Sequence, residues 1–321
     1  MNLVANGNLT TVSRVTGHKT LSHTLQRDFK LNKYKYLIIL PIIVYLVLFA
    51  YKPMYGLIIA FKDYRPALGI AASKWVGWKH FNNFFHDVYF WRLIRNTFSI
   101  SGLSILFGFP APILLALFLN EIRVSWFKRT IQTITYMPYF ISMVVVCSLV
   151  RTYVQYDGLI SQLAVALGGE PQNYLMVNKY FYPIYIISDI WKNIGWNSII
   201  YLAALTSIDQ DQYEAARIDG AGRFKQMIHI TLPGLLPTIT ILFILRMGGI
   251  LNVGYEKILL LYNEGIYEVS DVISTYTYRK GILNAAYSYS TAVGLFNSVV
   301  NVTFLLLSNF ISRKTTEMSL F

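Results

Sequence analysis

Long apolar runs with few charges constrain this chain more than any other feature of its sequence. A helix needs about 20 mostly apolar residues to cross a bilayer. Six runs of this kind are present, at approximately 37–60, 97–119, 131–153, 183–205, 235–253 and 291–311. They are continuous and lack the apolar–polar alternation of barrel strands. The sequence therefore predicts an all-α, polytopic membrane protein with six transmembrane helices.

The distribution of charge predicts how these helices are oriented. Only 14% of the residues are charged, against about 25% in soluble domains, and the formal net charge is +12. Basic residues gather in the N-terminal segment, in the loop after the second run and in the tail, so both termini are expected in the cytoplasm. The segment 62–95 has six basic residues on the predicted outer side, which counts against this topology. Attraction to anionic lipid explains the cytoplasmic basic residues without a nucleic-acid partner.

Motifs of catalysis and of cofactor binding are not found in the sequence. It has no Gly-Lys pair, so it has no phosphate-binding loop of the Walker type, and it has no nucleophile elbow. The five histidines show no metal-ligand spacing, and Cys147 has no second cysteine with which to pair. We therefore predict that the chain is not an enzyme and binds neither metal nor cofactor.

The segment 209–233, between the fourth and fifth runs, has the most specific pattern. Acidic residues at its start predict a short helix over 213–219, because they stabilise the positive end of a helix dipole. Gly220 and Gly222 predict a turn with positive φ. A second short helix is predicted over 224–230, with Pro233 and Pro237 marking the entry to the fifth run. Small residues at 215, 216 and 221 would let a partner protein approach closely.

This segment resembles the EAA loop of ABC-importer permeases. The match consists of Glu214-Ala215-Ala216, Asp219-Gly220-Ala221 and a distal Ile230-Thr231-Leu232-Pro233. In that family the loop is a coupling helix that docks into the ATPase subunit and transmits nucleotide-driven closure to the membrane. The resemblance assigns ATPase coupling to these residues: Glu214, Ala215, Ala216, Asp219, Gly220 and Gly222.

The resemblance extends over about 35–315 and implies a type I ABC-importer transmembrane domain. The runs 51–64 and 75–81 resemble the carbohydrate-uptake branch, most of all permeases for polysaccharide or uronate oligosaccharide fragments such as alginate or pectin pieces. The expected divisions are a flexible cytoplasmic segment 1–35, a first transmembrane helix with an external loop at 36–95, a permease core at 96–312, and a cytoplasmic tail at 313–321.

The family also implies an assembly in the bacterial cytoplasmic (inner) membrane. Its expected partners are a second homologous permease, two ATPase subunits that carry ATP and magnesium, an extracytoplasmic solute-binding protein, an oligosaccharide and membrane lipid. Tyrosines in the loop 254–290 suit either the binding-protein interface or a membrane-interface belt.

Polar residues on the fourth run predict a transport pathway. They recur at i, i+3, i+4, i+7 and i+8, on one face of a helix, namely Asp189, Lys192, Asn193, Trp196 and Asn197. Such a face avoids lipid, where a central charge costs about 3 kcal/mol. Alignment to the related maltose permease on Glu-Ala-Ala places the first four on sugar contacts. It also places Arg246, Gly249 and Ile250 of the fifth run near such contacts.

Arg246 departs from the family, which has a small polar residue at this position. The departure suits a carboxylated sugar, and we hypothesise that Lys192 or Arg246 pairs with a uronate. An ion network between helices, formed by Asp189, Lys192 and Arg246, is the structural alternative. Two other functions remain open, an ion-coupled secondary transporter with Asp189 as its ion site and a membrane receptor or scaffold.

Overall fold

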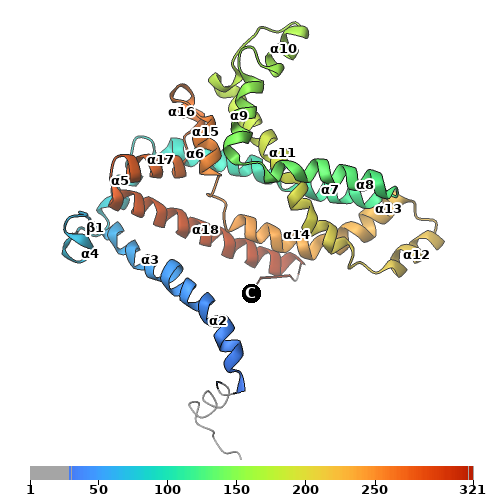
Figure 1. The fold of residues 1–321 in the computed structure, drawn as a ribbon, viewed down its shortest axis with the longest axis horizontal. Coiled ribbons are helices and arrows are strands. Elements are labelled where there is room, and N and C mark those ends of the chain that lie inside the picture. Colours follow the sequence, from blue (N-terminus) through green and yellow to red (C-terminus); the bar gives the residue numbers. More distant parts are fainter. Residues whose placement is uncertain (1–28, 30, 317, 321) are drawn as a thin grey trace, which may run out of the picture. The chain divides into compact units, whose positions relative to one another are not determined.

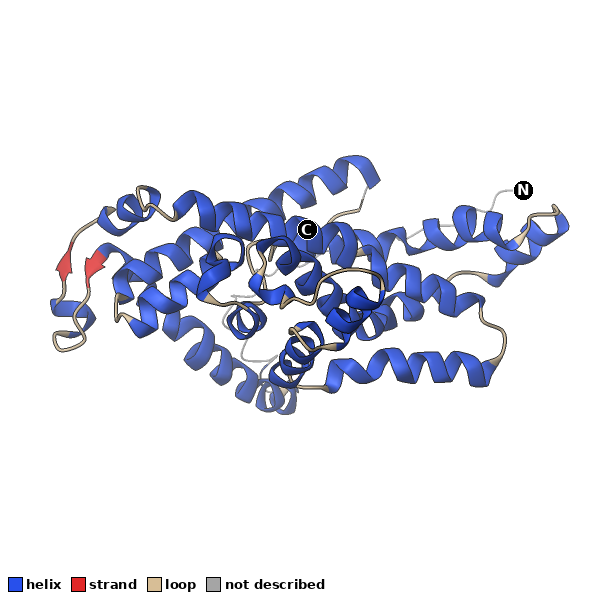
Figure 2. Ribbon diagram, turned by 90° about the horizontal axis from the view of Figure 1, so that it is seen from above, coloured by secondary structure: helices blue, strands red, loops and turns tan. Residues whose placement is uncertain are grey.

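The computed structural model describes residue 29, residues 31–316 and residues 318–320. The chain divides into two units, Met1–Gly56 and Leu57–Phe321, which are described separately. Helices make up almost all of the ribbon in Figure 2, as expected for an all-α protein. Most of the predicted flexible segment 1–35 lies outside the described residues, so that expectation stays a prediction.

The first unit is helical throughout its described main part. Its elements are α2 (Lys33–Leu46), a π-helical turn (Val47–Tyr51) and α3 (Lys52–Met54). A 3-10 helix (Tyr55–Phe61) follows across the boundary into the second unit. Together they form the predicted first span, as one helical stretch, Lys33–Phe61.

The second unit begins with a small outer subregion and continues as a helix bundle. Its helices and strands, all but β2 labelled in Figure 1, are β1 (Lys62–Asp63), α4 (Gly69–Ala72), β2 (Lys74–Trp75), α5 (Lys79–Phe85), α6 (Phe90–Leu103), α7 (Pro110–Glu121), α8 (Ser125–Tyr136), α9 (Met143–Val154), α10 (Leu159–Ala166), α11 (Asn178–Leu205), α12 (Gln210–Ile218), α13 (Arg223–Gln226), α14 (Leu232–Met247), α15 (Tyr255–Leu261), α16 (Tyr267–Ser270), α17 (Ile273–Tyr278) and α18 (Tyr287–Thr316). The two strands pair antiparallel, with Lys62 opposite Trp75.

Four helical stretches of the described chain are long and apolar enough to cross a membrane: Lys33–Phe61, Phe90–Glu121, Arg223–Met247 and Tyr287–Thr316. A bent helix pair brings the number to five if it counts as one span. The predicted fourth span corresponds to α11, which is long enough at 28 residues, but its polar residues make it less apolar than the others. The count of six therefore stays a prediction.

The predicted third span, 131–153, is not a single helix. The helical stretches Ser125–Phe140 and Met143–Ala166 meet at an angle of 103°. Pro138 lies in the 3-10 turn that ends the first stretch. The Ser142 hydroxyl accepts a hydrogen bond from the Val145 amide at 3.4 Å and caps the second stretch. Apolar content alone did not reveal this break, although both residues are ordinary helix-end signals.

The fifth span also differs from its prediction. Instead of a separate short helix over 224–230 and a span over 235–253, one helical stretch runs from Arg223 to Met247. It passes through a π-helical turn, Met227–Thr231, directly before α14. It ends early because the backbone turns at Gly248 and Gly249, and a helix C-terminus favours glycine.

Three π-helical turns share one sequence context. Val47–Tyr51, Ser104–Gly108 and Met227–Thr231 are each followed two residues later by a proline, at Pro53, Pro110 and Pro233. A proline ring clashes with the carbonyl four residues earlier and lacks an N–H to bond it. Widening the preceding turn relieves this conflict, so each helix continues through its proline.

The core of the second unit is organised around α11. Its N-terminal half contributes Phe181, Tyr185 and Ile186 to one apolar cluster with α9 and α15. Its C-terminal half contributes Tyr201 and Leu205 to another cluster with α7 and α14. A helix that packs on both sides in this way can carry polar residues without exposing them to lipid.

Buried polar contacts attach the outer loops to the bundle. Asp271 is fully buried and forms a two-pronged ion pair with Arg279, with N–O distances of 2.9 and 2.6 Å. Asn96, buried in α6, donates hydrogen bonds of 2.9 Å to the carbonyls of Glu268 and Asp271. These contacts hold the segment 264–283 against the N-terminal half of α6.

Asp87 makes a second attachment of the same kind. Its carboxylate accepts hydrogen bonds from the hydroxyls of Tyr276 and Tyr289 and from the Tyr89 amide. Burial raises the pKa of Asp87, but these hydrogen bonds outweigh it, so the net pKa is lowered. The lowered pKa means that Asp87 contributes stability above its unfolded pKa and loses that contribution as acid protonates it.

Gly195 allows α11 and α8 to approach closely, and this generates a testable prediction. A Cβ atom at Gly195 would collide with the Thr135 carbonyl and with the Tyr136 ring. We expect Gly195→Ala to destabilise the protein by about 1–3 kcal/mol through overpacking. Thermal unfolding of the purified complex in detergent measures this change. Gly102→Ala in α6 is the matched control, because open space surrounds that position, and it should be neutral or slightly stabilising.

Candidate functional site

A cavity of about 480 Å³ lies between α11, the α6–α7 region and α14. From α11 it receives Asp189, Asn193 and Asn197, which are spaced by four residues and share a face. The π-helical turn Ser104–Gly108 contributes the opposite part of the wall. The cavity therefore brings together three of the five polar residues predicted on the fourth run.

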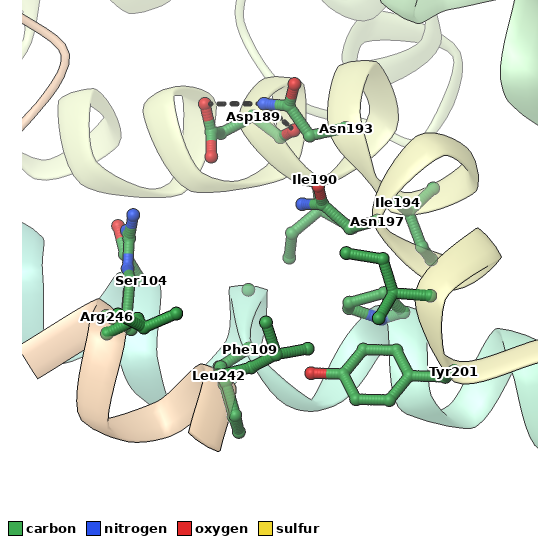
Figure 3. Close-up of a pocket in the computed structure, with 14 residues that line it drawn as sticks. Ser104, Phe109, Asp189, Ile190, Asn193, Ile194, Asn197, Tyr201, Leu242 and Arg246 are labelled. Atoms are coloured by element: carbon green, nitrogen blue, oxygen red, sulfur yellow. Dashed lines mark hydrogen bonds between the residues drawn. The ribbon is translucent and has the colours of Figure 1, made fainter. Parts of the chain in front are cut away.

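Arg246 lines the same cavity from the end of α14. Figure 3 shows its side chain rising toward the α11 wall that carries Asp189 and Asn193. Within the described part of the chain, its guanidinium makes no hydrogen bond and no ion pair at bonding distance. A guanidinium has five N–H donors, so Arg246 offers the cavity an unused binding group for a carboxylate. The predicted network of Asp189, Lys192 and Arg246 is absent from these described contacts.

Lys192 and Trp196 do not line the cavity. They contact residues at the break in the predicted third span. The Lys192 ammonium is buried and donates hydrogen bonds to the carbonyls of Pro138, Tyr139 and Ile141 at 3.3, 3.0 and 2.5 Å. Trp196 stacks on Tyr139, with ring centroids 4.4 Å apart and planes within 5°. The Lys192 ammonium is thus used within the chain itself, whereas Trp196 is 39% exposed, and its predicted sugar contact stays a prediction.

Gly249 and Ile250 also do not line the cavity. They belong to the turn after α14, where Ile250 is buried and its carbonyl accepts a hydrogen bond from the Ser101 hydroxyl. Leu251 donates its backbone N–H to Asn301 at 3.0 Å. Of the predicted residues on the fifth run, only Arg246 reaches the cavity wall.

Lys257 is a functional candidate that sequence reasoning missed. Its ammonium lies 3.3 Å from an Asp189 carboxylate oxygen and 2.8 Å from the Tyr185 carbonyl, and its side chain is only 2% exposed. Burial lowers the pKa of Lys257, and the Asp189 carboxylate opposes this shift. In the sequence Lys257 is one of several loop charges, and no local pattern links it to Asp189.

The Asp189 carboxylate is therefore paired within the protein. The same oxygen that faces Lys257 accepts a hydrogen bond from the Asn193 amide at 3.2 Å, and that amide also contacts the Asp189 carbonyl (Figure 3). The Asp189 carboxylate is thus paired with Lys257, whereas Arg246 on the same cavity wall has no ion-pair partner among the described residues.

The predicted coupling segment forms a helix, a turn and the start of another helix. Asp209 caps α12 by accepting a hydrogen bond from the Asp211 amide at 3.0 Å. Gly220 has the expected positive φ of +74°, whereas Gly222 does not. The Tyr213 hydroxyl lies 2.9 Å from that of Thr231, which ties α12 to the stretch leading into α14. The predicted helix over 213–219 is thus confirmed, with the bounds Gln210–Ile218.

This segment has two large apolar side chains that are exposed among polar and charged residues. Every residue of α12 is at least partly exposed, and the Ile218 and Phe224 side chains are 87% and 69% exposed. Figure 1 shows α12 far from α15–α17. Glu214 is exposed on the same helix. Large exposed apolar side chains next to charges are typical of a docking surface.

Comparison with known families identifies the chain. The model of the family described as "Binding-protein-dependent transport system inner membrane component" matches residues 108–317. The chain belongs to this family. It is therefore a membrane permease with the type I ABC-importer fold, and the family consists of transport permeases rather than enzymes.

Two curated relatives of the permease come from Bacillus subtilis (strain 168). Protein LplB is 46% identical over 91% of this chain and 92% of its own length. The polygalacturonan/rhamnogalacturonan transport system permease protein YteP is 46% identical over 90% of this chain and 91% of its own length.

Among solved structures, the permease is similar to a chain of a bacterial ABC transporter involved in the import of the acidic polysaccharide alginate. That match has a TM-score of 0.85 and 44% identity, and it covers 91% of this chain and 99% of the other. A second structure, of a bacterial alginate ABC transporter in complex with alginate pentasaccharide-bound periplasmic protein, also has a TM-score of 0.85. Its identity is 43%, over 92% of this chain and 99% of the other.

The pairing of Asp189 with Lys257 in the permease generates a prediction. Breaking a buried ion pair by removing one partner costs about 3–5 kcal/mol, and the cost falls where solvent reaches the charge that is left. Asp189→Asn leaves the buried Lys257 cation without a counter-charge, whereas Lys257→Met leaves a carboxylate that the cavity can hydrate. We expect Asp189→Asn to lower the thermal unfolding midpoint of the complex more than Lys257→Met does. Equal losses would contradict this asymmetry.

Proposed function

We propose that the permease forms half of the membrane pathway of an ATP-driven importer for oligosaccharides that carry carboxylates. The observation that carries this proposal is the Arg246 guanidinium, which lines the cavity and has no partner among the described residues. A uronate carboxylate would accept two parallel N–H bonds from it. The amides of Asn193 and Asn197 supply donors and acceptors for sugar hydroxyls on the opposite wall.

Names of similar proteins support an acidic substrate. The relatives include a polygalacturonan/rhamnogalacturonan permease and a transporter for the acidic polysaccharide alginate. Both polygalacturonan and alginate consist of uronate units, which is the chemistry that Arg246 suits.

The proposed assembly contains a second homologous permease, two ATPase subunits and an extracytoplasmic binding protein. The periplasmic protein in the similar alginate transporter supports the last of these. ATP and magnesium would be held by the ATPase subunits, and this chain would hydrolyse nothing. We infer a bacterial inner-membrane location with both termini in the cytoplasm, as the basic residues at 1–35 and 313–321 favour.

In this proposal, α12 couples ATP hydrolysis to the pathway. Its exposed Ile218, together with Phe224, would enter an apolar cleft of the ATPase, while Glu214, Ala215 and Ala216 allow close contact. The positive-φ turn at Gly220 and the neighbouring Asp219 and Gly222 connect α12 to the stretch Arg223–Met247. Because Arg246 is at the far end of that stretch, movement of α12 would be transmitted to the cavity wall.

The ion-coupled alternative receives less support. It requires an Asp189 carboxylate free to bind an ion, but Asp189 is already paired with Lys257 and hydrogen-bonded by Asn193. Membership of the binding-protein-dependent family favours the ATP-driven importer as well.

The role of Arg246 can be tested by transport in vesicles that contain the complete complex. We expect Arg246→Ser to reduce uptake of uronate oligomers about ten- to a hundredfold, because a hydrogen bond to a charged group contributes about 1.5–3 kcal/mol. Uptake of neutral oligomers should change little. Arg313→Ser, in the exposed end of α18, is the matched control. An equal loss for acidic and neutral oligomers would remove the carboxylate from the proposal.

The coupling role can be tested by ATP hydrolysis of the reconstituted complex. We expect Glu214→Lys to abolish the stimulation by loaded binding protein while the complex still assembles, because the reversed charge disturbs the docking surface. Gln212→Lys adds a positive charge to the same exposed helix and serves as the control. Full stimulation of the Glu214→Lys complex would show that this residue has no part in coupling.

A further inference from the structure

A second cavity, of about 460 Å³, lies between α15, α17 and α18. Every described residue that lines it is uncharged, and its wall combines tyrosine rings with hydroxyl and amide groups. The residues used in the argument below are Tyr255, Ser274, Tyr278, Gly294 and Asn297. The cavity is similar in size to the one that contains Arg246, but its chemistry is different.

Two polar atoms at this cavity lack a partner. The Ser274 hydroxyl oxygen and the Asn297 side-chain oxygen are both buried, and neither has a hydrogen-bond partner among the described residues. A buried polar atom without a hydrogen-bond partner is destabilising, so such atoms are rare in native proteins. Both residues border the cavity, and a change of side-chain rotamer would let their oxygens bond an occupant with hydroxyl groups.

The aromatic part of the wall suits the same kind of occupant. The Tyr255 and Tyr278 rings are neighbours, with centroids 5.9 Å apart and planes inclined by 42°. Tyrosine rings offer apolar faces to the C–H side of a sugar ring, and their hydroxyls bond its polar edge. An apolar lipid chain would leave the hydroxyl and amide groups unsatisfied.

A single turn connects the two cavities. Residues 248–254 leave α14 just after Arg246, which lines the first cavity, and enter α15 at Tyr255, which lines the second. Within the turn, the side-chain oxygen of Asn252 accepts hydrogen bonds from the amides of Asn297 and Asn301 at 3.1 and 3.3 Å. The two cavities therefore lie at the two ends of one short turn, so different sugar units of one oligosaccharide can bind at them.

We propose that the cavity between α15, α17 and α18 is a second saccharide subsite, which binds the uncharged ring faces and hydroxyls of an oligosaccharide whose carboxylate is bound at Arg246. This inference rests on the proposed function and deepens it. In this inference, the length of the oligosaccharide is recognised at a cavity that is separate from the Arg246 site. A substrate too short to reach both cavities would use only the Arg246 site.

Gly294 provides a direct way to close this cavity. It lies on α18, it lines the cavity, and a Cβ atom built on it meets no atom within 4 Å. A phenylalanine at this position would occupy the cavity without a clash at its Cβ, and phenylalanine is a better helix former than glycine. Val299→Phe adds a ring to the same helix at a side chain that is 59% exposed and does not line the cavity, so it is the matched control.

The experiment measures ATP-driven uptake of a uronate pentasaccharide and of a uronate disaccharide by vesicles containing the complete complex. We expect Gly294→Phe to reduce uptake of the pentasaccharide roughly tenfold or more, with little change for the disaccharide. Val299→Phe should transport both sugars as the wild type does. Tyr278→Leu, which removes a ring instead of adding one, should weaken pentasaccharide uptake in the same direction.

The possible results distinguish failure of the second subsite from failure of the proposed function. If wild-type vesicles take up neither uronate, the proposed function fails. If they take up both and Gly294→Phe does the same, only the second subsite is overturned. Failure of Gly294→Phe to assemble with its partner permease, with Val299→Phe assembling normally, would also overturn it, because the cavity would then be a protein interface.

Discussion

The fold depends on how one long helix of the bundle, α11, carries polar residues through a largely apolar environment. In a bilayer, backbone and side-chain polar groups must find their partners within the protein. At the break between α8 and α9, the buried ammonium of Lys192 in α11 donates hydrogen bonds to the carbonyls of Pro138, Tyr139 and Ile141. A buried cation and a broken helix are each unfavourable alone in the membrane. Here the hydrogen bonds between them stabilise both.

The polar residues of α11 fall into two groups, one that contacts neighbouring helices and one that lines the cavity. On one edge of its face, Lys192 and Trp196 hold the neighbouring break. On the other, Asp189, Asn193 and Asn197 border the cavity, and Lys257 neutralises the single carboxylate among them. Arg246 of α14 also lines the wall, and it has no ion-pair partner within the part of the chain that the structure describes. The electrostatic character of the cavity therefore depends on which of its charged side chains are paired within the protein.

Prolines and glycines give the helices their functional geometry. Each of three π-helical turns precedes a proline, and one of them, Ser104–Gly108, forms part of the cavity wall. Gly195 lets α11 and α8 approach closely, and Gly220 reverses the chain after α12. A continuous helical stretch from Arg223 to Met247 joins the proposed coupling segment to the wall of the cavity, and it continues through Pro233 and Pro237.

The sequence by itself determined the membrane class, the approximate position of each apolar run and the helix–turn of the coupling segment. These depend on composition and local pattern, to which residues close in the chain contribute. The split of the polar face on α11, the bend of 103° in the third span and the pairing of Asp189 with Lys257 were decided only by the tertiary structure. Asp189 and Lys257 are 68 residues apart, so no periodicity relates them. Helical spacing tells which residues share a face, but a partner for each side chain depends on which helices pack against that face.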